Sequence, residues 1–461
     1  MNSRGGRDHK SKRHRIASIA LFLIIVFILQ PCRPAAARGL SDKDKTFLEN
    51  LAYRCFLLFW EQADPHTGLV PDRALTVGLP ETGRHRDIAN ISGTGFGLTA
   101  ICIGAKHHWI TKDQAQRRIL KTLDFLAHQA PQVHGWYYHW MDKTTGKRIL
   151  RSEVSSIDTS LLLGGVLTVR KAFPHDRQIV HLADFIYNRV DFPWMLNGSP
   201  DLLSHGWLPE SGFLTHRWDS YSELMLLYLL AIGSPTHPIP ASSWYAWRRP
   251  VVHFAGYTYV GEGPLFTQQY AQAWIDFRGL RDGPPSNVNF FANSIAATRA
   301  NRAFCLSLSR SFPKSYSSNV WGITASDGPD GYRVWGAPSS AAVIDGTVTP
   351  CAPGGSLMFA PRICLEALET MHARFGKQIY SRYGFADGFN PTTGWVDKDV
   401  ISIDTGITLL SAENLLDGGV WHWFMKNRNI RRAIFLAQLL SENKVIRTFE
   451  LHYPGPYLFY P

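Results

Sequence analysis

Two carboxylates, Asp219 and Glu223, stand in a glycine- and aromatic-rich segment that leads into an apolar run ending at Leu230. Residues four apart on a helix share one face, so both side chains can point into the same space. Paired acids can move protons around a glycosidic oxygen, and the neighbouring Trp218 and Tyr221 have flat faces on which a sugar ring can stack. The segment therefore indicates carbohydrate hydrolysis.

The same segment also has a structural interpretation. Ser220-x-x-Glu223 has the spacing of a capping box, a hydrogen-bond pattern found at the first turn of many ordinary helices. On this segment alone the capping role is favoured. The rest of the chain reverses that preference, because further acids stand in comparable places.

An internal repeat identifies those acids. Ser156-Ile157-Asp158-Thr159 recurs as Ser402-Ile403-Asp404-Thr405, and each copy follows an aromatic loop with a Thr-Gly pair and precedes a leucine-rich stretch. Unpaired N–H groups and the positive end of the dipole favour carboxylates at helix N-termini. We therefore expect Asp158, Glu223 and Asp404 to open buried helices at one end of the fold, with Glu153 on a loop that leads to the same end.

Two classes of helix alternate along the chain. Apolar helices that begin with small or polar residues are expected to start near Thr94, Ile157, Tyr221, Phe266, Gly355 and Asp404. Amphipathic segments with charged faces are expected over residues 42–62, 112–129, 177–190, 287–309 and 427–443. Paired helices around a ring would bury the first class and expose the second, so the sequence predicts an all-α (α/α)6 toroid. Short strands or ordered loops are expected over residues 251–263 and 321–335.

The N-terminal segment has the composition of a secretory signal. Six basic residues precede a 14-residue apolar run from Ile16 to Leu29, and Ala35-Ala36-Ala37 follows. The run is short for a membrane span, although an uncleaved anchor is the alternative. We therefore predict a signal peptide over residues 1–37, a single catalytic domain over residues 38–461, and a periplasmic or secreted protein that contacts a membrane only if the segment is retained.

Charge and cysteine content exclude several classes. The net charge is +11, and the segment to Ala37 contributes +6 of it, so the remaining mild surplus gives no indication of a nucleic-acid partner. Cys55, Cys102, Cys305, Cys351 and Cys364 are odd in number and lack a C-x-x-C spacing. Buried free thiols are the expectation for them.

Seven motifs together resemble the glucoamylase-like family of bacterial exported proteins, which includes endo-β-1,2-glucanases and has a related domain in cyclic β-1,2-glucan synthases. They include SEVSSIDT, WDSYSELM and WGITASDGPDGY, and they lie at residues 59–73, 92–100, 152–159, 218–225, 234–238, 321–332 and 395–399. The resemblance covers about Ser41 to Phe435. It implies an (α/α)6 fold and a glycoside hydrolase that acts on β-1,2-glucan with inversion. One departure from the family pattern is Thr405-Gly406-Ile407, where the resemblance leads us to expect Gln-Gly-Pro.

The resemblance makes Glu153 and Glu223 the candidate catalytic carboxylates, with Asp158 and Asp404 beside the same motifs. Inversion needs an acid and a base about 6.5–9.5 Å apart. We assign Glu223 as the acid, because aromatic neighbours can desolvate it and raise its pKa. Glu153 and Asp404 are the alternatives for the base.

Two of these acids have structural alternatives. Asp158 follows Ser155 at capping spacing, so it can stabilise a helix start as well as face the site. Asp219 can hydrogen-bond a sugar or hold Arg217. The pair Asp219 and Glu223, on adjacent turns of one helix, would suit a retaining mechanism, which needs carboxyls about 5–5.5 Å apart.

Aromatic residues near these motifs are candidate sugar platforms, with core packing as the alternative. The set comprises Trp136, Tyr138, Trp207, Trp218, Tyr221, Trp321 and Trp395. The acidic turn at residues 327–332 resembles a calcium loop but lacks the ligand at position 12 of an EF-hand. We expect no metal and no cofactor.

Two other functions fit the same fold. A polysaccharide lyase would need a Tyr or His base and a basic cluster to neutralise a uronate, whereas the expected cleft is acidic and aromatic. A non-catalytic glycan-binding protein would have no need of the carboxylates. The glucan substrate is thus the expected partner, and nucleic acid is not.

Overall fold

The computed structural model describes residues 39–79, 83, 85–336, 338 and 343–441. The predicted signal segment at residues 1–37 and the sixth cysteine, Cys32, lie outside the described residues. All the described residues belong to one compact unit.

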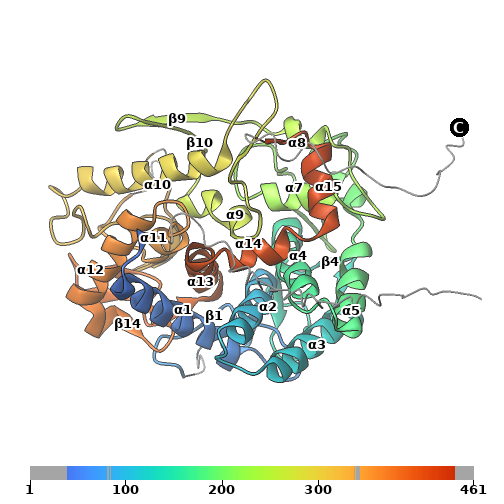
Figure 1. The fold of residues 1–461 in the computed structure, drawn as a ribbon, viewed down its shortest axis with the longest axis horizontal. Coiled ribbons are helices and arrows are strands. Elements are labelled where there is room, and N and C mark those ends of the chain that lie inside the picture. Colours follow the sequence, from blue (N-terminus) through green and yellow to red (C-terminus); the bar gives the residue numbers. More distant parts are fainter. Residues whose placement is uncertain (1–38, 80–82, 84, 337, 339–342, 442–461) are drawn as a thin grey trace, which may run out of the picture. The chain divides into compact units, whose positions relative to one another are not determined.

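Six apolar stretches form helices whose residues are almost all buried (Figure 1). They are α2 (Ile91–Lys106), α4 (Ser156–Ala172), α7 (Met225–Ile232), α9 (Tyr270–Trp274) with the 3-10 turn η2 (Leu265–Gln268) before it, α11 (Cys351–Gly355) and α13 (Ser402–Leu416). Consecutive members pack together, from α2 and α4 through α7, α9, η2 and α11 to α13, and α13 packs against α2 again. The predicted helix starts at these six places are confirmed, except at α7 and α11.

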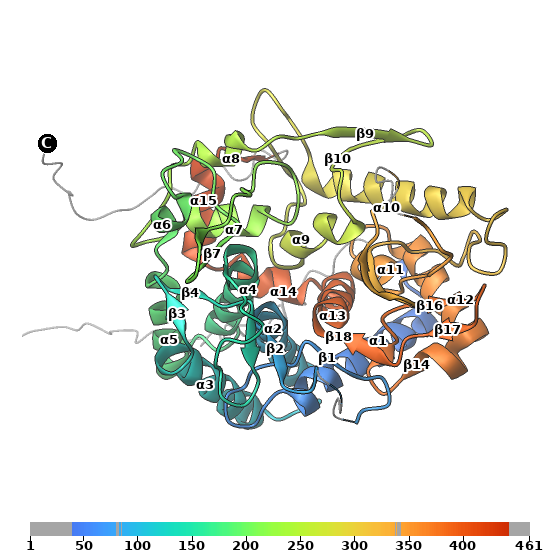
Figure 2. The same ribbon diagram turned by 180° about the vertical axis from the view of Figure 1, so that it is seen from behind.

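Amphipathic helices cover this buried set (Figures 1 and 2). They are α1 (Asp42–Gln62), α3 (Lys112–His128), α5 (Arg177–Asn188), α10 (Phe290–Ser307), α12 (Pro361–Ile379) and α15 (Arg428–Leu436), with the short helices α6 (Phe192–Leu196) and α8 (Ser243–Ala246). The short helix α14 (Gly419–Phe424) instead lies in the middle, packed against α2, α4, α9 and α13. Capping boxes fix the starts of two of them, with Ser41 opposite Asp44 at α1 and Thr111 opposite Gln114 at α3.

The boundary at α11 differs from the prediction. A helix was expected to start near Gly355, but α11 ends there and an outer helix, α12, starts at Pro361. Proline suits the first turn of a helix because it has no N–H to leave unpaired, so Pro361 marks a start rather than an interior position. The stretch from residue 351 to 379 is therefore two helices.

Glycines allow the buried helices to approach closely. A Cβ atom on Gly95 of α2 would lie 2.2 Å from the carbonyl oxygen of Leu161 on α4, and one on Gly165 would lie 2.1 Å from the carbonyl oxygen of Gly95. Real Cβ atoms do not come that close, so the contact between α2 and α4 requires glycine at both positions.

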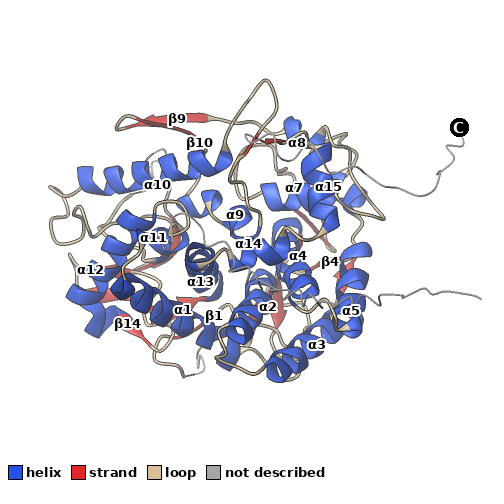
Figure 3. Cartoon of the chain, viewed as in Figure 1, coloured by secondary structure: helices blue, strands red, loops and turns tan. Residues whose placement is uncertain are grey.

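The strands are short and lie between the helices (Figure 3). Eight antiparallel pairs are β1 (Arg73–Leu75) with β18 (Asp399–Ile401), β2 (Ile88–Asn90) with β5 (Trp140–Asp142), β3 (Gln132–Val133) with β4 (Trp136–Tyr137), β9 (Val251–Phe254) with β10 (Tyr257–Val260), β11 (Leu280–Arg281) with β19 (Leu440–Ser441), β12 (Ala325–Gly328) with β13 (Gly331–Val334), β14 (Tyr380–Ser381) with β15 (Gly384–Phe385), and β16 (Phe389–Asn390) with β17 (Trp395–Val396). A three-stranded sheet joins β6 (Val154–Ser155), β7 (Gly206–Leu208) and β8 (Gly212–Phe213).

Three of these strands run directly into buried helices. β2 ends at Asn90 before α2, β6 ends at Ser155 before α4, and β18 ends at Ile401 before α13. Each ladder fixes the position of the helix start that follows it. The strands expected within residues 251–263 and 321–335 are confirmed as β9 with β10 and β12 with β13.

The cysteines behave as predicted: the five in the described residues are free and buried. Within the same part of the chain, every helix is too short or too polar to span a bilayer.

Candidate active site

The start of α4 is built around a serine cap. The Ser155 hydroxyl accepts a hydrogen bond from the Asp158 backbone N–H at 3.2 Å and donates one to the Asp158 carboxylate. Asp158 is 8% exposed. The structural role considered for Asp158 is therefore present, in the first turn of a buried helix as predicted.

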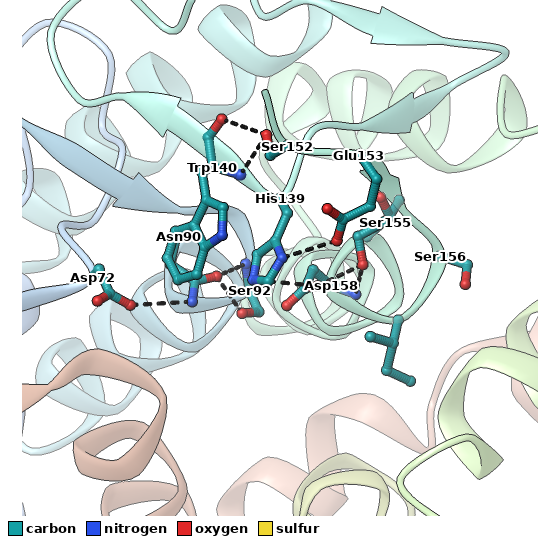
Figure 4. Close-up of polar contacts among 12 residues, drawn as sticks. Asp72, Asn90, Ser92, His139, Trp140, Ser152, Glu153, Ser155, Ser156 and Asp158 are labelled. Carbon is teal, nitrogen blue, oxygen red and sulfur yellow. Dashed lines mark hydrogen bonds and ion pairs between the residues drawn. The ribbon is translucent and has the colours of Figure 1, made fainter. Parts of the chain in front are cut away.

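His139 joins two of the predicted carboxylates (Figure 4). Its Nδ1 lies 3.0 Å from Oε1 of Glu153, and its Nε2 lies 3.7 Å from Oδ2 of Asp158. The imidazole also stacks on the indole of Trp140, with ring centroids 4.1 Å apart. His139, on the loop between β4 and β5, thus holds Glu153, which precedes α4, and Asp158, which lies in its first turn.

The charges in this group determine its protonation. Burial lowers the pKa of His139, but the charge of Asp158 and the hydrogen bond to Glu153 outweigh burial and raise it overall. Burial raises the pKa of Glu153, yet the hydrogen bond and charge of His139 lower it overall. The arrangement therefore favours an imidazolium that donates a proton toward each carboxylate.

Glu223 lies in the turn just before α7, which begins at Met225. The predicted capping box with Ser220 is wrong, because the helix has Leu224 as its N-cap and no side-chain cap, while Ser220 forms a bridge with Arg248. The predicted helix start at Glu223 is two residues too early, because α7 begins at Met225. The Glu223 carboxyl therefore makes no hydrogen bond that caps α7.

Burial raises the pKa of Glu223 to about 7; its own backbone N–H lowers it, and the charge of Asp158 raises it further. A carboxyl with a pKa near neutrality is suited to donate a proton to a leaving group. The charge of Asp158 thus links the protonation of Glu223 to the group around His139.

Asp404 occupies the first turn of α13, as predicted, and is 5% exposed. Burial raises its pKa to about 6, and hydrogen bonds with Asp387 and with the thiol of Cys351 hold it below a higher value. Unlike α4, the helix has a hydrophobic N-cap, Ile401, which makes no side-chain hydrogen bond. The carboxyl of Asp404 is therefore not engaged in capping.

Tyr270 connects the two sides of the site. The pKa of its buried phenol is raised well above the usual value by burial, and the charges of Asp404 and Glu223 both add to that shift. The charges of Asp404, in the first turn of α13, and of Glu223, in the turn before α7, thus both act on the phenol at the start of α9.

A second acidic group surrounds Arg73 at the end of β1. The guanidinium lies 2.6 Å from Asp327, 3.2 Å from Asp72 and 3.8 Å from Asp399. The acidic turn at residues 327–332 is the tight turn of β12 and β13, with Gly331 at φ +106°. Its first aspartate thus faces Arg73 rather than completing a calcium loop.

Two groups of described residues have ligand atoms close enough to surround a metal ion. They are His139 with Glu153 and Asp158, and Asp327 with Asp397 and Asp399. In the first group the imidazole already bonds the carboxylates, and in the second Arg73 supplies the positive charge. We therefore interpret both as ion-paired groups.

Asp219 lies apart from this site. Its side chain is about half exposed and stands 3.8 Å from Arg248, whereas Arg217 donates hydrogen bonds to backbone carbonyls of Leu196, Asn197 and Leu202. Of the two alternatives for Asp219, the pairing with Arg217 is thus wrong, and a hydrogen bond to a sugar stays a prediction. The premise that Asp219 and Glu223 share one helix is also wrong, because α7 starts after both.

The candidate platforms divide by exposure. Trp136 and Trp321 are fully buried, and Tyr138, Trp218 and Tyr221 are nearly so, with the Tyr221 hydroxyl donating to Gln268. These rings pack in the core, which disagrees with a role in stacking on a sugar. Trp207 and Trp395 are partly exposed and keep a face that a sugar can reach.

Sequence reasoning missed His139, Tyr270 and Asp387. His139 and Asp387 stand in loops beside motifs that did draw attention, and Tyr270 opens a short helix; none has a spacing that reveals its partner. Only the folded chain brings them to Glu153, Glu223 and Asp404.

Comparisons with known proteins identify similar sequences. Residues 215–428 match the family model Glycoamylase, described as "Putative glucoamylase". The exo-β-1,2-glucooligosaccharide sophorohydrolase (non-reducing end) of Parabacteroides distasonis is 27% identical, over 86% of this chain. The chain spans 58% of the length of that curated relative.

Solved structures share the fold. The endo-β-1,2-glucanase of Chitinophaga pinensis, in complex with sophorotriose and glucose, superposes with a TM-score of 0.80 at 26% identity, covering 87% of this chain and 99% of that one. A β-1,2-glucanase from Parabacteroides distasonis superposes with a TM-score of 0.79 at 26% identity, covering 86% of this chain and 60% of that one. The resemblance of this chain to the bacterial glucoamylase-like family is therefore confirmed.

Proposed function

We propose that this protein is a glycoside hydrolase that cleaves β-1,2-glucan by an inverting acid–base mechanism. The observation that carries the proposal is the pKa of Glu223, which burial raises to about 7. The charge of Asp158 adds to that shift, and the charges of Glu223 and Asp404 both act on the phenol of Tyr270. The similarity to proteins named as β-1,2-glucanases and a sophorohydrolase supplies the substrate class.

In this mechanism Glu223 is the acid and Asp404 the base. Glu223 would protonate the glycosidic oxygen as the bond breaks, which its pKa allows near neutral pH. Asp404 belongs to another helix, and its carboxyl would take a proton from the attacking water. Glucose units bound between them would have the acid on one face and the base on the other.

Glu153 is the alternative base, and its contacts argue for a different role. One of its oxygens already accepts a hydrogen bond from His139, whose charge lowers the pKa of Glu153 and makes it a weaker base. A role in holding His139 and binding a sugar hydroxyl fits those contacts better.

We further propose that the fold is an (α/α)6 toroid. The unbroken series of packed buried helices from α2 to α13 and back to α2 supports it, as does the outer set of amphipathic helices. The site would then lie at the end of the ring where the buried helices start.

The proposed location is the periplasm or the exterior, after removal of residues 1–37. Expression of the full chain in a Gram-negative host, followed by fractionation and N-terminal sequencing, tests this. A soluble periplasmic product that begins at Arg38 is expected; a product that stays in the membrane with its N-terminus intact would show an uncleaved anchor.

The activity itself is tested by incubating residues 38–461 with linear β-1,2-glucan. One new reducing end is expected for each glycosidic bond that is cleaved. Unsaturated products would show a lyase, and binding without products would show a glycan-binding protein. Curdlan, a β-1,3-glucan, is the matched control and should not be cleaved.

A further inference from the structure

The carboxyl of Asp404 meets a second buried carboxyl, that of Asp387, in the loop between β15 and β16. Asp387 is 4% exposed and Asp404 5%. The two carboxyls come within hydrogen-bonding reach of each other. The proposed chemistry leaves Asp387 without a role.

Very few donors reach this pair. The backbone N–H of Asp327 donates to Oδ2 of Asp387 at 2.8 Å, and the thiol of Cys351 donates to Asp404. If both acids were ionised, Oδ1 of Asp387 and Oδ2 of Asp404 would be buried without a partner. Burying an unpaired carboxylate is costly, and two such charges side by side repel each other.

A small cavity adjoins the pair. Its volume is about 20 Å³, and its walls include Cys351, Asp387, Asp404 and Thr408. Leu51, Cys55 and Tyr383 also line it. Among the described residues that line this cavity, none is Lys or Arg.

We propose that Asp387 is a positioning residue that stays protonated and donates a hydrogen bond to Asp404, which keeps Asp404 ionised and fixed as the base. The inference rests on the proposed function, with Asp404 as base. One proton shared between two buried carboxyls supplies the donor that the surrounding protein lacks.

The position of the proton follows from the two environments. Asp404 lies in the first turn of the 15-residue helix α13, where the helix dipole favours the charged form, and it receives the thiol of Cys351. Asp387 lies in a loop and faces Asp397. Burial raises the pKa of Asp387 well above its usual range, and the charges of Asp404 and Asp397 raise it further.

Several other ionisable groups surround the pair. Those that bear on it are Asp72, Asp327 and Asp397, the thiol of Cys351, and the phenols of Tyr270 and Tyr332, with Arg73 behind Asp327. The carboxylates raise the pKa of the pair. Arg73 pairs with Asp327 and Asp72 rather than with Asp387 or Asp404, so the shared proton is the main compensation within the pair.

Infrared difference spectroscopy tests the proton directly. At neutral pH, wild type minus Asp387→Asn should show the C=O stretch of one protonated carboxylic acid that the variant lacks. Asp113→Asn, on the exposed face of α3, is the matched control and should leave that band unchanged. An unchanged acid band in Asp387→Asn would overturn the proposal, whether or not the protein hydrolyses glucan.

Kinetics test the positioning role. Asn keeps a donor for Asp404, so Asp387→Asn should retain kcat within about threefold and leave the acid limb of the pH profile in place. Ala removes the donor, so Asp387→Ala should lower kcat by about tenfold or more and move that limb up by about one pH unit. Equal losses in both variants with no movement of the limb would contradict the positioning role.

The two readouts separate the possible failures. If wild type does not cleave the glucan, the proposed function fails and the infrared band still decides the state of Asp387. If Asp387→Ala does not fold, Asp387→Asn and the infrared band decide both points.

Discussion

The starts of α4 and α13 carry the same four residues, Ser-Ile-Asp-Thr, and use the aspartate differently. Before α4 the cap is Ser155, whose hydroxyl bonds both the backbone and the carboxylate of Asp158. Before α13 the same position is Ile401, and no side chain caps the helix. The cap of α4 therefore has a side-chain hydroxyl that the cap of α13 lacks.

The partners of the two acids differ accordingly. Asp158 meets the positive ring of His139, whereas Asp404 meets another acid, Asp387. The contacts with Ser155 and His139 hold the Asp158 carboxylate in place. The shared proton that we propose for Asp387 and Asp404 would instead suit Asp404 to exchange protons. The comparison shows that a repeated motif does not by itself reveal which copy does chemistry.

The largest effect on kcat is expected from a change at Glu223. Glu223→Gln should lower kcat by about 10²–10⁴-fold, because Gln cannot donate the proton that the leaving oxygen needs. The thermal midpoint should stay equal or rise at pH 7, since Glu223 has a raised pKa and its ionised form is costly to bury. Glu366→Gln on α12, which removes an exposed ion pair with Arg362, is the matched control.

Near-normal turnover by Glu223→Gln would remove Glu223 from the mechanism. A large loss in Glu366→Gln as well would show that the assay reports general damage.

The two equivalent aspartates should then separate. Asp404→Asn should lower kcat by about 10²-fold or more, because the base is lost, whereas Asp158→Asn should lower it by about tenfold or less, because the amide still occupies the capped turn. Steady-state kinetics at saturating glucan, with circular dichroism to confirm folding, make the comparison. The reverse ranking would make Asp158 the chemical member of the repeat.

The pH profile sharpens the same contrast. Activity requires Asp404 ionised and Glu223 protonated, so kcat/KM should rise as the pH passes about 6, the pKa of Asp404, and fall as it passes about 7, that of Glu223. Asp404→Asn should remove the rising limb from the residual activity. A profile that is flat from pH 5 to 8 is incompatible with this pair of acids.

The smallest effect concerns the cap itself. Ser155→Ala should lower the free energy of unfolding by about 1 kcal/mol, because the cap of α4 is lost, with a modest change in kcat. Ser402→Ala is the matched control: its buried hydroxyl has no hydrogen-bond partner among the described residues, so its removal should leave stability unchanged or improved. Chemical denaturation measures both, and equal losses would argue against the cap.

Helix periodicity predicted much of the fold. Residues 42–62 form α1 as expected, and the buried starts near Thr94, Ile157 and Asp404 lie within a few residues of α2, α4 and α13. A half-buried helix is accessible because its apolar residues recur with a 3.6-residue period. In contrast, α2, α4 and α13 are buried on nearly all sides and were recognisable as apolar runs that begin with small or polar residues. Pro361 and the turn at Glu223 were missed, since both boundaries depend on local contacts rather than on periodicity.

The candidate site was predictable only in part. Glu153, Asp158, Glu223 and Asp404 were recognisable because acids at helix starts and in family motifs carry a signal. Their partners were not, because the bonds that tune them join residues from separate loops. The raised pKa values on which the mechanism depends arise chiefly from burial, and the partners adjust them.

The stereochemistry of the first product tests the central claim most directly. We propose that Glu223, in the turn before α7, and Asp404, in the first turn of α13, act on opposite sides of the bond with a water at the base, which predicts single displacement. Time-resolved proton NMR of linear β-1,2-glucan with fresh enzyme should therefore show the α-anomer of the new reducing end before mutarotation. Initial release of the β-anomer would contradict the account, because retention requires a nucleophilic carboxylate about 5–5.5 Å from the acid.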